Sequence, residues 1–333
     1  MKPTLGINRA GVTYSAPSVR VPRHVGGLAR IDAVPTEPCP TSTDDELNVR
    51  LPFRPPLDAA ALFGFLRARA VGGVEDAGAE HYSRALRLAH GAGTVTLRPR
   101  RDHVAATLRL ADQRDRDSAI AHSRRLLDLD SDPAAVAEVL DGDPALAPML
   151  RKHPGVRVPG SVDGAEIVVR AVLGQQVSVA AARTAAQRLT EALGEPLTCA
   201  DGAITRLFPT PAAIASGVTG VLTGPKRRTE ALRLVCEALA DGSLLVDPGR
   251  DADELSTQLR TFPGIGPWTA NYVALRVLGA ADVLLDGDLA MRRGAAALGL
   301  PDRPGALRTR AQRWHPWRSY AGMLLWLANQ PPT

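Results

Sequence analysis

The feature that most constrains the fold is a change in the spacing of apolar residues near residue 131. Upstream of it, short runs at 47–53, 81–89, 93–100 and 103–111 alternate apolar and polar residues between Gly-rich or polar turns. Such alternation is typical of antiparallel strands with one buried face. Downstream, apolar residues recur at i, i+3 and i+4 in segments that Gly or Pro ends, which predicts short helices and no further strands. We therefore expect a mainly α protein with an N-terminal α+β domain built on an antiparallel sheet.

The N-terminal boundary of this domain follows from a change in composition. Residues 1–45 are rich in Pro, Gly, Ser and Thr and show no sustained period, which predicts a flexible arm. Helical spacing over 57–71, with Asp58 as its N-cap, and over 115–130 completes the unit. We assign the α+β domain to residues 46–137.

Charge and cysteine content narrow the classes of function. The chain has 40 basic and 35 acidic residues, a net charge of +5, which permits a nucleic-acid partner without requiring one. Seven arginines and two aspartates in 288–333 concentrate the basic charge there, although a solvated helix face would look the same. The three cysteines are far apart and form no C-x-x-C, which argues against a cysteine zinc finger or an iron–sulfur cluster. No apolar run suits a secretory signal or a membrane span, so we expect a cytoplasmic, nucleoid-associated protein.

The segment Pro-Gly-Ile-Gly at 263–266 is the strongest local motif. A predicted helix ends at Phe262 and another begins near Pro267, so these four residues form a tight hairpin. Two glycines permit unusual backbone conformations, and their N–H groups can face an anion. A DNA phosphate would bind there without any base contact, hence independently of sequence. An ordinary helix–helix turn is the alternative.

This hairpin segment, over 259–293, resembles the helix-hairpin-helix, Gly/Pro-Asp superfamily of DNA glycosylases. Within it the sequence is most similar to the bacterial inducible DNA-3-methyladenine glycosylase II family, over about 47–330. The blocks that carry the similarity, in the same order, are FGFLRARAV, PGVRVPGSVDGAEIVVRAVLGQQVSVAAA, LFPTPAAIA and WHPWRSYAGMLLW. The resemblance implies a helix-hairpin-helix glycosylase fold with two helical subdomains, one of 138–163 plus 281–333 and one of 164–280 that holds the helix-hairpin-helix (259–275).

The resemblance also implies an activity and a substrate. It implies a monofunctional, monomeric glycosylase that hydrolyses the N-glycosidic bond of alkylated bases, such as 3-methyladenine, in double-stranded DNA. Bifunctional relatives place a lysine where Trp268 stands, and that amine forms a Schiff base that leads to strand cleavage. No lysine occurs between 227 and 333, so we expect no lyase activity. Two alternatives remain: a glycosylase of the same fold for oxidised or mismatched bases, and a catalytically inactive DNA-binding repair protein.

Asp288, twenty residues after Trp268, occupies the position of the family's catalytic aspartate. As a carboxylate it would stabilise an oxocarbenium ion electrostatically. The sequence departs from the family here, because it reads Leu285-Asp286-Gly287-Asp288 where a Pro commonly precedes the loop. Asp286 is the competing candidate, and either aspartate could be a helix cap instead.

Aromatic residues supply the implied base pocket. The resemblance assigns it to Trp268, Tyr272 and Trp326, and the first two lie on one helix face at i, i+4. Electron-rich rings attract a cationic alkylated purine through cation–π contacts. For Trp314 and Trp317 we favour packing in the core.

The remaining implied contacts concern DNA and ions. The phosphate would meet Gly264, Gly266 and Thr269. Gln176 falls where the family inserts a wedge into the gap left by the flipped nucleotide, although a leucine stands there in the best-known relative, and a surface Gln that caps a helix turn is the alternative. No cofactor is required. The family's hairpin can hold a sodium or potassium ion on backbone carbonyls, here those of Phe262 and Ile265.

Overall fold

The computed structural model describes residues 46–329. The arm predicted over 1–45 lies outside these residues. In the described part, no helix is both long and apolar enough to cross a membrane.

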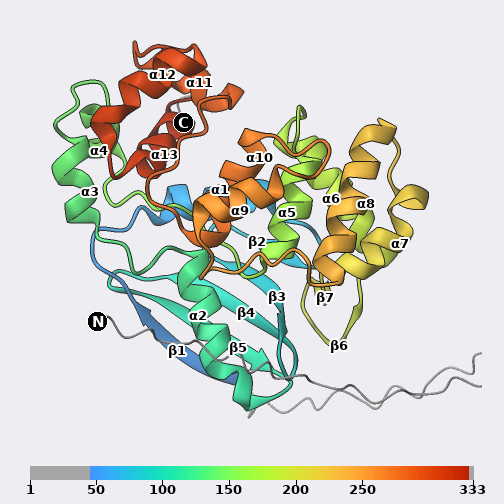
Figure 1. The fold of residues 1–333 in the computed structure, drawn as a ribbon. Helices are drawn as coiled ribbons and strands as arrows, with labels where there is room; N and C mark the ends of the chain where they lie inside the picture. The colour runs from blue at the N-terminus through green and yellow to red at the C-terminus, as the bar shows by residue number, and fades with distance from the viewer. Residues whose placement is uncertain (1–45, 330–333) are drawn as a thin grey trace, which may run out of the picture. The chain divides into compact units, whose positions relative to one another are not determined.

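The N-terminal part is built on a five-stranded antiparallel sheet in the order β1-β5-β4-β3-β2 (Figure 1). Four strands confirm the alternating runs, because Val104, Ala106 and Leu108 of β5, for example, are buried on one face. The three-residue strand β2 was not predicted. The strands are β1 (Glu46–Pro52), β2 (Glu75–Ala77), β3 (Tyr82–Leu88), β4 (Gly91–Pro99) and β5 (His103–Leu110).

Two helices complete this unit. Helix α1 (Ala59–Arg69) begins as predicted at Asp58, whose carboxylate accepts a hydrogen bond from Ala61 N at 3.0 Å. Helix α2 (Arg116–Leu126) follows the short 3-10 turn Gln113–Asp115 and packs across β3, β4 and β5 (Figure 1). Both helices bury apolar residues in one core with the sheet. The predicted α+β architecture is confirmed.

From residue 133 onwards the chain is mainly helical, and several helices begin at an oxygen-bearing cap. Asp132, Asp163, Ser178, Thr210 and Asp251 each accept a first-turn backbone N–H, an interaction that stabilises a helix by about 1 kcal/mol. The helices are α3 (Pro133–Leu140), α4 (Ala147–Lys152), α5 (Gly164–Leu173), α6 (Val179–Leu193), α7 (Pro211–Val221), α8 (Lys226–Ala240), α9 (Ala252–Leu259), α10 (Pro267–Val273), α11 (Leu289–Ala297), α12 (Pro304–Arg310) and α13 (Arg318–Ala328), with a π-helical turn at Ala274–Leu278 and a 3-10 turn at Ala311–Trp314.

The expectation that strands end near residue 131 is wrong in one place. A small antiparallel hairpin, β6 (Pro196–Asp201) and β7 (Ile204–Arg206), lies between α6 and α7. Its strands are short and β6 has no buried residue, so the sequence shows no apolar alternation there. Gly202, with φ +60°, makes the turn.

Two further apolar cores hold the helices. One gathers α5 to α10, and the other gathers α3, α4 and α11 to α13. Tyr272 packs against both, and Trp268 and Trp326 pack against the second. The aromatic residues singled out in the sequence therefore lie where the two helical cores meet. The subdomain boundaries given above stay a prediction.

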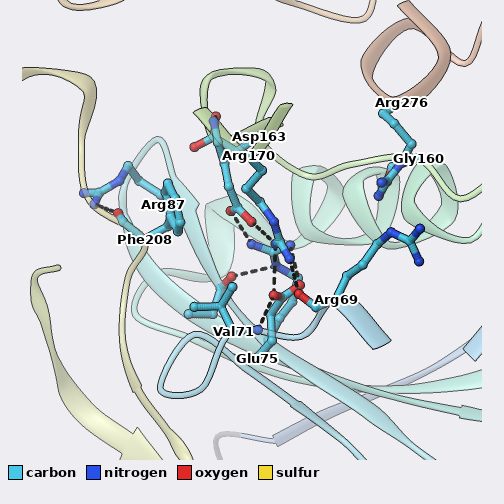
Figure 2. Close-up of polar contacts among 12 residues, drawn as sticks. Arg69, Val71, Glu75, Arg87, Gly160, Asp163, Arg170, Phe208 and Arg276 are labelled. Carbon is cyan, nitrogen blue, oxygen red and sulfur yellow. Dashed lines mark hydrogen bonds and ion pairs between the residues drawn. The ribbon is translucent and has the colours of Figure 1, made fainter. Parts of the chain in front are cut away.

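A buried set of four charged residues, hereafter the paired network, joins the sheet to α5 (Figure 2). Arg84 of β3 approaches Glu166 at 2.6 Å, and Arg170 approaches Glu75 of β2 at 2.9 Å and Glu166 at 2.7 Å. Two positive charges therefore meet two negative ones, as the burial of charge demands. Arg170 also donates to the carbonyl of Arg69, at the end of α1. The network fixes α1, α5 and the sheet relative to one another.

Candidate active site

The carboxylate of Asp288 is held at the start of α11 by three N–H groups. Its Oδ1 accepts hydrogen bonds from Met291 N at 2.9 Å and from Trp326 Nε1 at 3.0 Å, and its Oδ2 accepts one from Trp268 Nε1 at 3.1 Å. All three donors are neutral, and no cation pairs with Asp288 within residues 46–329. The carboxylate is thus fixed in place while its negative charge stays uncompensated.

Asp286, the competing aspartate, has a different environment. Its carboxylate lies 2.7 Å from the Arg308 guanidinium, which compensates its charge. Within residues 46–329 the indole N–H groups of both tryptophans donate to Asp288 and not to Asp286. Asp288 does cap α11, which was the alternative interpretation of this residue. The same carboxylate also contacts the two indoles. The geometry therefore favours Asp288 over Asp286 as the reacting carboxylate.

The predicted pocket residues form part of one aromatic cluster. Trp268 and Tyr272 stack with ring centroids 5.3 Å apart and planes 14° apart, as the i, i+4 spacing implied. Trp326 lies 6.0 Å from Phe65 of α1, a residue that the sequence analysis did not single out. All four rings are partly exposed. The structure thus brings together Trp268, Tyr272, Trp326 and Asp288, and adds Phe65.

The other two tryptophans lie elsewhere. Trp314 is fully buried and donates through Nε1 to Asp143 at 2.6 Å, so it belongs to the core. Trp317 packs edge-on against Tyr320. Neither is in contact with Asp288, in agreement with the core packing that we favoured for both.

The hairpin between α9 and α10 has two glycines with different requirements. Gly264 has φ +85°, and a Cβ there would lie 3.1 Å from Ala231, so this position needs glycine. Gly266 has φ −98°, which any residue adopts, and open space beside it. The expectation that both glycines have unusual backbone conformations is therefore wrong for Gly266, whose lack of a side chain instead leaves the surface open.

Thr269 and Gln175 tie this hairpin to the loop after α5. The Thr269 side chain is buried, and its hydroxyl accepts from Gln175 Nε2 at 2.9 Å. Gln175 Nε2 also donates to the carbonyl of Gly264 at 2.9 Å. A phosphate would consequently meet the backbone of Thr269 and not its hydroxyl. The next residue, Gln176, is exposed and has φ +57°. This left-handed backbone conformation is uncommon for a residue other than glycine.

Two arginines that the sequence analysis did not select lie beside the aromatic cluster. The guanidinium carbon of Arg69 lies 3.6 Å from the Phe65 centroid, and that of Arg276 lies 5.0 Å from it. Phe65 and Arg69 are four residues apart on α1, as Tyr272 and Arg276 are on the helix after the hairpin. That repeated aromatic–arginine spacing was the only sequence signal for these residues.

Known proteins are similar to this chain over most of its length. The AlkA N-terminal domain family matches residues 48–163. A Mycobacterium tuberculosis protein named as a probable bifunctional transcriptional activator/DNA repair enzyme AlkA is 44% identical over 88% of this chain. The chain spans only 59% of that relative's length.

Two further matches cover nearly all of their own chains. DNA-3-methyladenine glycosylase 2 of Escherichia coli is 36% identical over 281 residues, 83% of this chain and 95% of the E. coli protein. The solved 3-methyladenine DNA glycosylase of Archaeoglobus fulgidus has the same fold, with a TM-score of 0.74, 21% identity, and coverage of 84% of this chain and 98% of its own. This chain therefore belongs to the AlkA family of DNA-3-methyladenine glycosylases, and its fold is that of the helix-hairpin-helix glycosylases.

Proposed function

We propose that this protein removes alkylated bases from double-stranded DNA by hydrolysing the N-glycosidic bond, as a step of base excision repair. The observation that carries the proposal is the uncompensated carboxylate of Asp288, held by the indole N–H groups of Trp268 and Trp326. A fixed negative charge beside stacking surfaces suits a reaction that develops positive charge on a sugar attached to a planar base. Membership of the AlkA family supports the same activity.

In the proposed reaction the damaged nucleotide leaves the duplex and its base enters the aromatic cluster. The C1′–N bond breaks, and the Asp288 carboxylate stabilises the oxocarbenium ion electrostatically. A water molecule adds its oxygen to C1′ and releases one proton to the solvent, which leaves an abasic sugar and the free base. An alkylated purine is cationic and departs as a neutral molecule, so it needs little further help to leave.

The hairpin would bind the DNA backbone. The N–H groups of Trp268 and Thr269 donate to no loop or turn carbonyl within residues 46–329, and the first hydrogen bond into α10 runs from Ala270 N to Gly266 O. Those N–H groups and the open surface at Gly266 suit a phosphate oxygen. We propose Gln176 as the wedge, since its neighbour Gln175 braces that loop against the hairpin.

A sodium or potassium ion at the hairpin is also part of the proposal. The Phe262 carbonyl accepts a hydrogen bond from Ile265 N at 3.1 Å and keeps a second lone pair, while the Ile265 carbonyl accepts none of the loop hydrogen bonds within residues 46–329. Both oxygens therefore suit a weakly held monovalent cation, which would add positive charge near the phosphate. The reaction itself uses no cofactor in this proposal.

Trp268 stands where a lyase would need an amine, so we propose hydrolysis without strand cleavage. We also propose that the protein acts as a monomer in the cytoplasm, at the nucleoid. The test uses duplexes with one 7-methylguanine, one 8-oxoguanine or no lesion, incubated with the full chain and then divided into samples with and without alkali.

The proposal expects base loss from the 7-methylguanine duplex alone, with nicks only after alkali. Excision of 8-oxoguanine, or nicking without alkali, would favour a different glycosylase of this fold. Binding to abasic DNA with no base release from any duplex would favour an inactive DNA-binding protein.

A further inference from the structure

The start of α8 carries three consecutive basic residues, Lys226, Arg227 and Arg228. Their side chains have no hydrogen-bond or ion-pair partner within residues 46–329. Glu230, the next acidic residue along the helix, is already paired with Arg233 at 2.6 Å. The positive charge at the start of α8 is therefore not compensated by any side chain in that part of the protein.

The hairpin between α9 and α10 lies against this end of α8. A Cβ added to Gly264 would lie 3.1 Å from the Cβ of Ala231, a buried residue of α8. Arg227 and Arg228 precede Ala231 by four and three residues, a spacing that places residues on the same face of a helix. One helical turn rises about 5.4 Å. The two arginines therefore lie beside the hairpin, one turn from the contact with Gly264.

The three basic side chains differ in exposure and direction. Arg227 is exposed, whereas Arg228 is half-buried, and its guanidinium lies over the preceding loop, where a Cβ added to Gly224 would be 3.2 Å from Nη2. Lys226 precedes Ala231 by five residues, so it lies on a different face of α8. Arg227 is consequently the basic residue that is both exposed and on the face of α8 that meets the hairpin.

The basic segment that the sequence emphasises, 288–333, is different in this respect. Three of its seven arginines form ion pairs with aspartates, namely Arg308, Arg310 and Arg318. An arginine that is paired with a carboxylate has less net charge to offer to a DNA phosphate. The start of α8, which the sequence analysis did not single out, therefore places unpaired positive charge directly beside the hairpin.

This end of α8 is remote from the candidate active site. Leu232 and Val235 of α8 lie in one helical core, and Met291 and Trp326, which hold Asp288, lie in or against the other. In the view of Figure 1, α8 and α13 lie on opposite sides of α10. The arginines of α8 can therefore change how tightly DNA is held without changing the reaction at the sugar.

The spacing of phosphates along DNA suits this arrangement. One strand presents a phosphate about every 3.4 Å of helix axis, so a strand with one phosphate at the hairpin brings the next within reach of a long side chain one helical turn away. A guanidinium donates two parallel hydrogen bonds to phosphate oxygens. The hairpin offers neutral N–H groups, whereas an arginine neutralises the phosphate and releases its counterion. The arginine contact is consequently the one that weakens with salt.

We propose that Arg227 binds the DNA phosphate next to the one at the hairpin, and that the charge of Arg228 strengthens this second contact with the same strand. A phosphate contact carries no sequence information, so it holds damaged and undamaged DNA equally. This inference rests on the proposed function, because it takes DNA as the substrate, and it adds a binding site outside the candidate active site.

The test measures the affinity of the full chain for an undamaged duplex and for the same duplex with an abasic analogue, at several salt concentrations. Arg227→Gln removes the charge, and Arg227→Lys keeps it. Lys226→Gln is the matched control, because it removes an equal charge one residue away on a different face of α8. Melting temperatures show whether each variant is folded, and single-turnover excision of 7-methylguanine at saturating protein reports the chemical step.

We expect Arg227→Gln to weaken binding to both duplexes by about 3- to 10-fold at low salt, and to lower the slope of log affinity against log salt concentration by about 1, as the loss of one phosphate contact requires. Arg227→Lys should keep the wild-type slope. Arg228→Gln should weaken binding by a smaller factor than Arg227→Gln, and Lys226→Gln should leave the slope unchanged. The excision rate at saturating protein should stay within about twofold of the wild type in every variant.

An unchanged salt slope in Arg227→Gln would overturn the inference, and so would an equal change in Lys226→Gln, because diffuse attraction by net charge affects neighbouring residues alike. Either result, in a protein that still excises 7-methylguanine, would leave the proposed function intact. Wild-type protein that shows the expected differences in affinity but releases no base would support the second phosphate contact and overturn the proposed function. Wild-type protein that binds neither duplex would overturn both.

Discussion

Two sets of charged side chains lie close together in this protein and are satisfied in opposite ways. In the paired network, Arg84 and Arg170 meet Glu75 and Glu166, so the charges cancel. At the candidate active site, the hydrogen-bond partners of Asp288, Arg69 and Arg276 within residues 46–329 are neutral N–H, carbonyl and hydroxyl groups. Cancelled charges lock elements together, whereas charges held by neutral groups keep an electric field that a substrate can experience. We expect changes in the first set to lower stability and changes in the second to lower activity.

The largest effect should come from Asp288→Asn. The substitution removes the negative charge but keeps the size of the side chain, so single-turnover excision of 7-methylguanine should fall by several orders of magnitude. Binding to DNA with an abasic analogue should stay nearly unchanged, as a gel-shift titration would show. Asp286→Asn is the matched control, because Arg308 already compensates that charge. Loss of activity in Asp286→Asn with retention in Asp288→Asn would show that the wrong carboxylate has been chosen.

The next largest effect should come from Glu166→Gln. This variant leaves two buried arginines with one carboxylate, which should lower the free energy of unfolding by about 3–5 kcal/mol in urea denaturation. Excision per folded molecule should change far less than in Asp288→Asn. A stable Glu166→Gln protein would contradict the assignment of this network to stability.

The network also predicts a pH dependence. Burial would raise the pKa of Glu166, but Arg84 and Arg170 outweigh burial and lower it. Since the folded pKa lies below the unfolded value of about 4.3, the stabilisation is complete above that value and is lost as the pH falls through the folded pKa. The urea midpoint of the wild type should therefore fall on acidification below about pH 4, and that of Glu166→Gln should fall less steeply.

The two glycines of the hairpin allow the same comparison between an effect on stability and an effect on function. Gly264→Ala forces a Cβ onto a residue with φ +85° and towards Ala231, a strain of about 1–3 kcal/mol. Melting temperature and affinity for damaged and undamaged DNA should fall together. Gly266→Ala meets open space within the protein, so it should lower DNA affinity without lowering the melting temperature. Loss of lesion recognition alone would contradict a phosphate contact.

Local patterns in the sequence were sufficient for most of the fold. Alternation predicted β1, β3, β4 and β5, and Asp58 marked the start of α1. Alternation could not reveal β6, which buries none of its residues, or β2, which has three residues. Alternation of apolar and polar residues therefore predicts strands that bury one apolar face, and it misses strands that are very short or bury no residue.

The site was predictable only in part, for a related reason. Trp268 and Tyr272 are close in sequence, and their stacking follows from helical spacing. Phe65 and Trp326 come from opposite ends of the chain, so only the fold brings their rings together. That neither Arg69 nor Arg276 pairs with a carboxylate in the described part of the chain, residues 46–329, is likewise a property of the packed structure, because a sequence does not show which charges are paired.

We expect the smallest effect at Trp326. Its ring belongs to the aromatic cluster, and its N–H donates to the Asp288 carboxylate. Trp326→Phe keeps an aromatic ring and removes one hydrogen bond to the carboxylate, so excision of 7-methylguanine and hypoxanthine should slow by the same factor, about tenfold. Trp326→Leu also removes most of the quadrupole. It should slow 7-methylguanine excision further, by a cation–π contribution of about 0.5–2 kcal/mol, and excision of hypoxanthine, a neutral lesion, less. Single-turnover rates for both lesions, together with melting temperatures, distinguish a Trp326 ring that contacts the base from one that only packs in the core. If Trp326→Leu lowers both rates equally and the melting temperature clearly drops, Trp326 supports the core and does not contact the base.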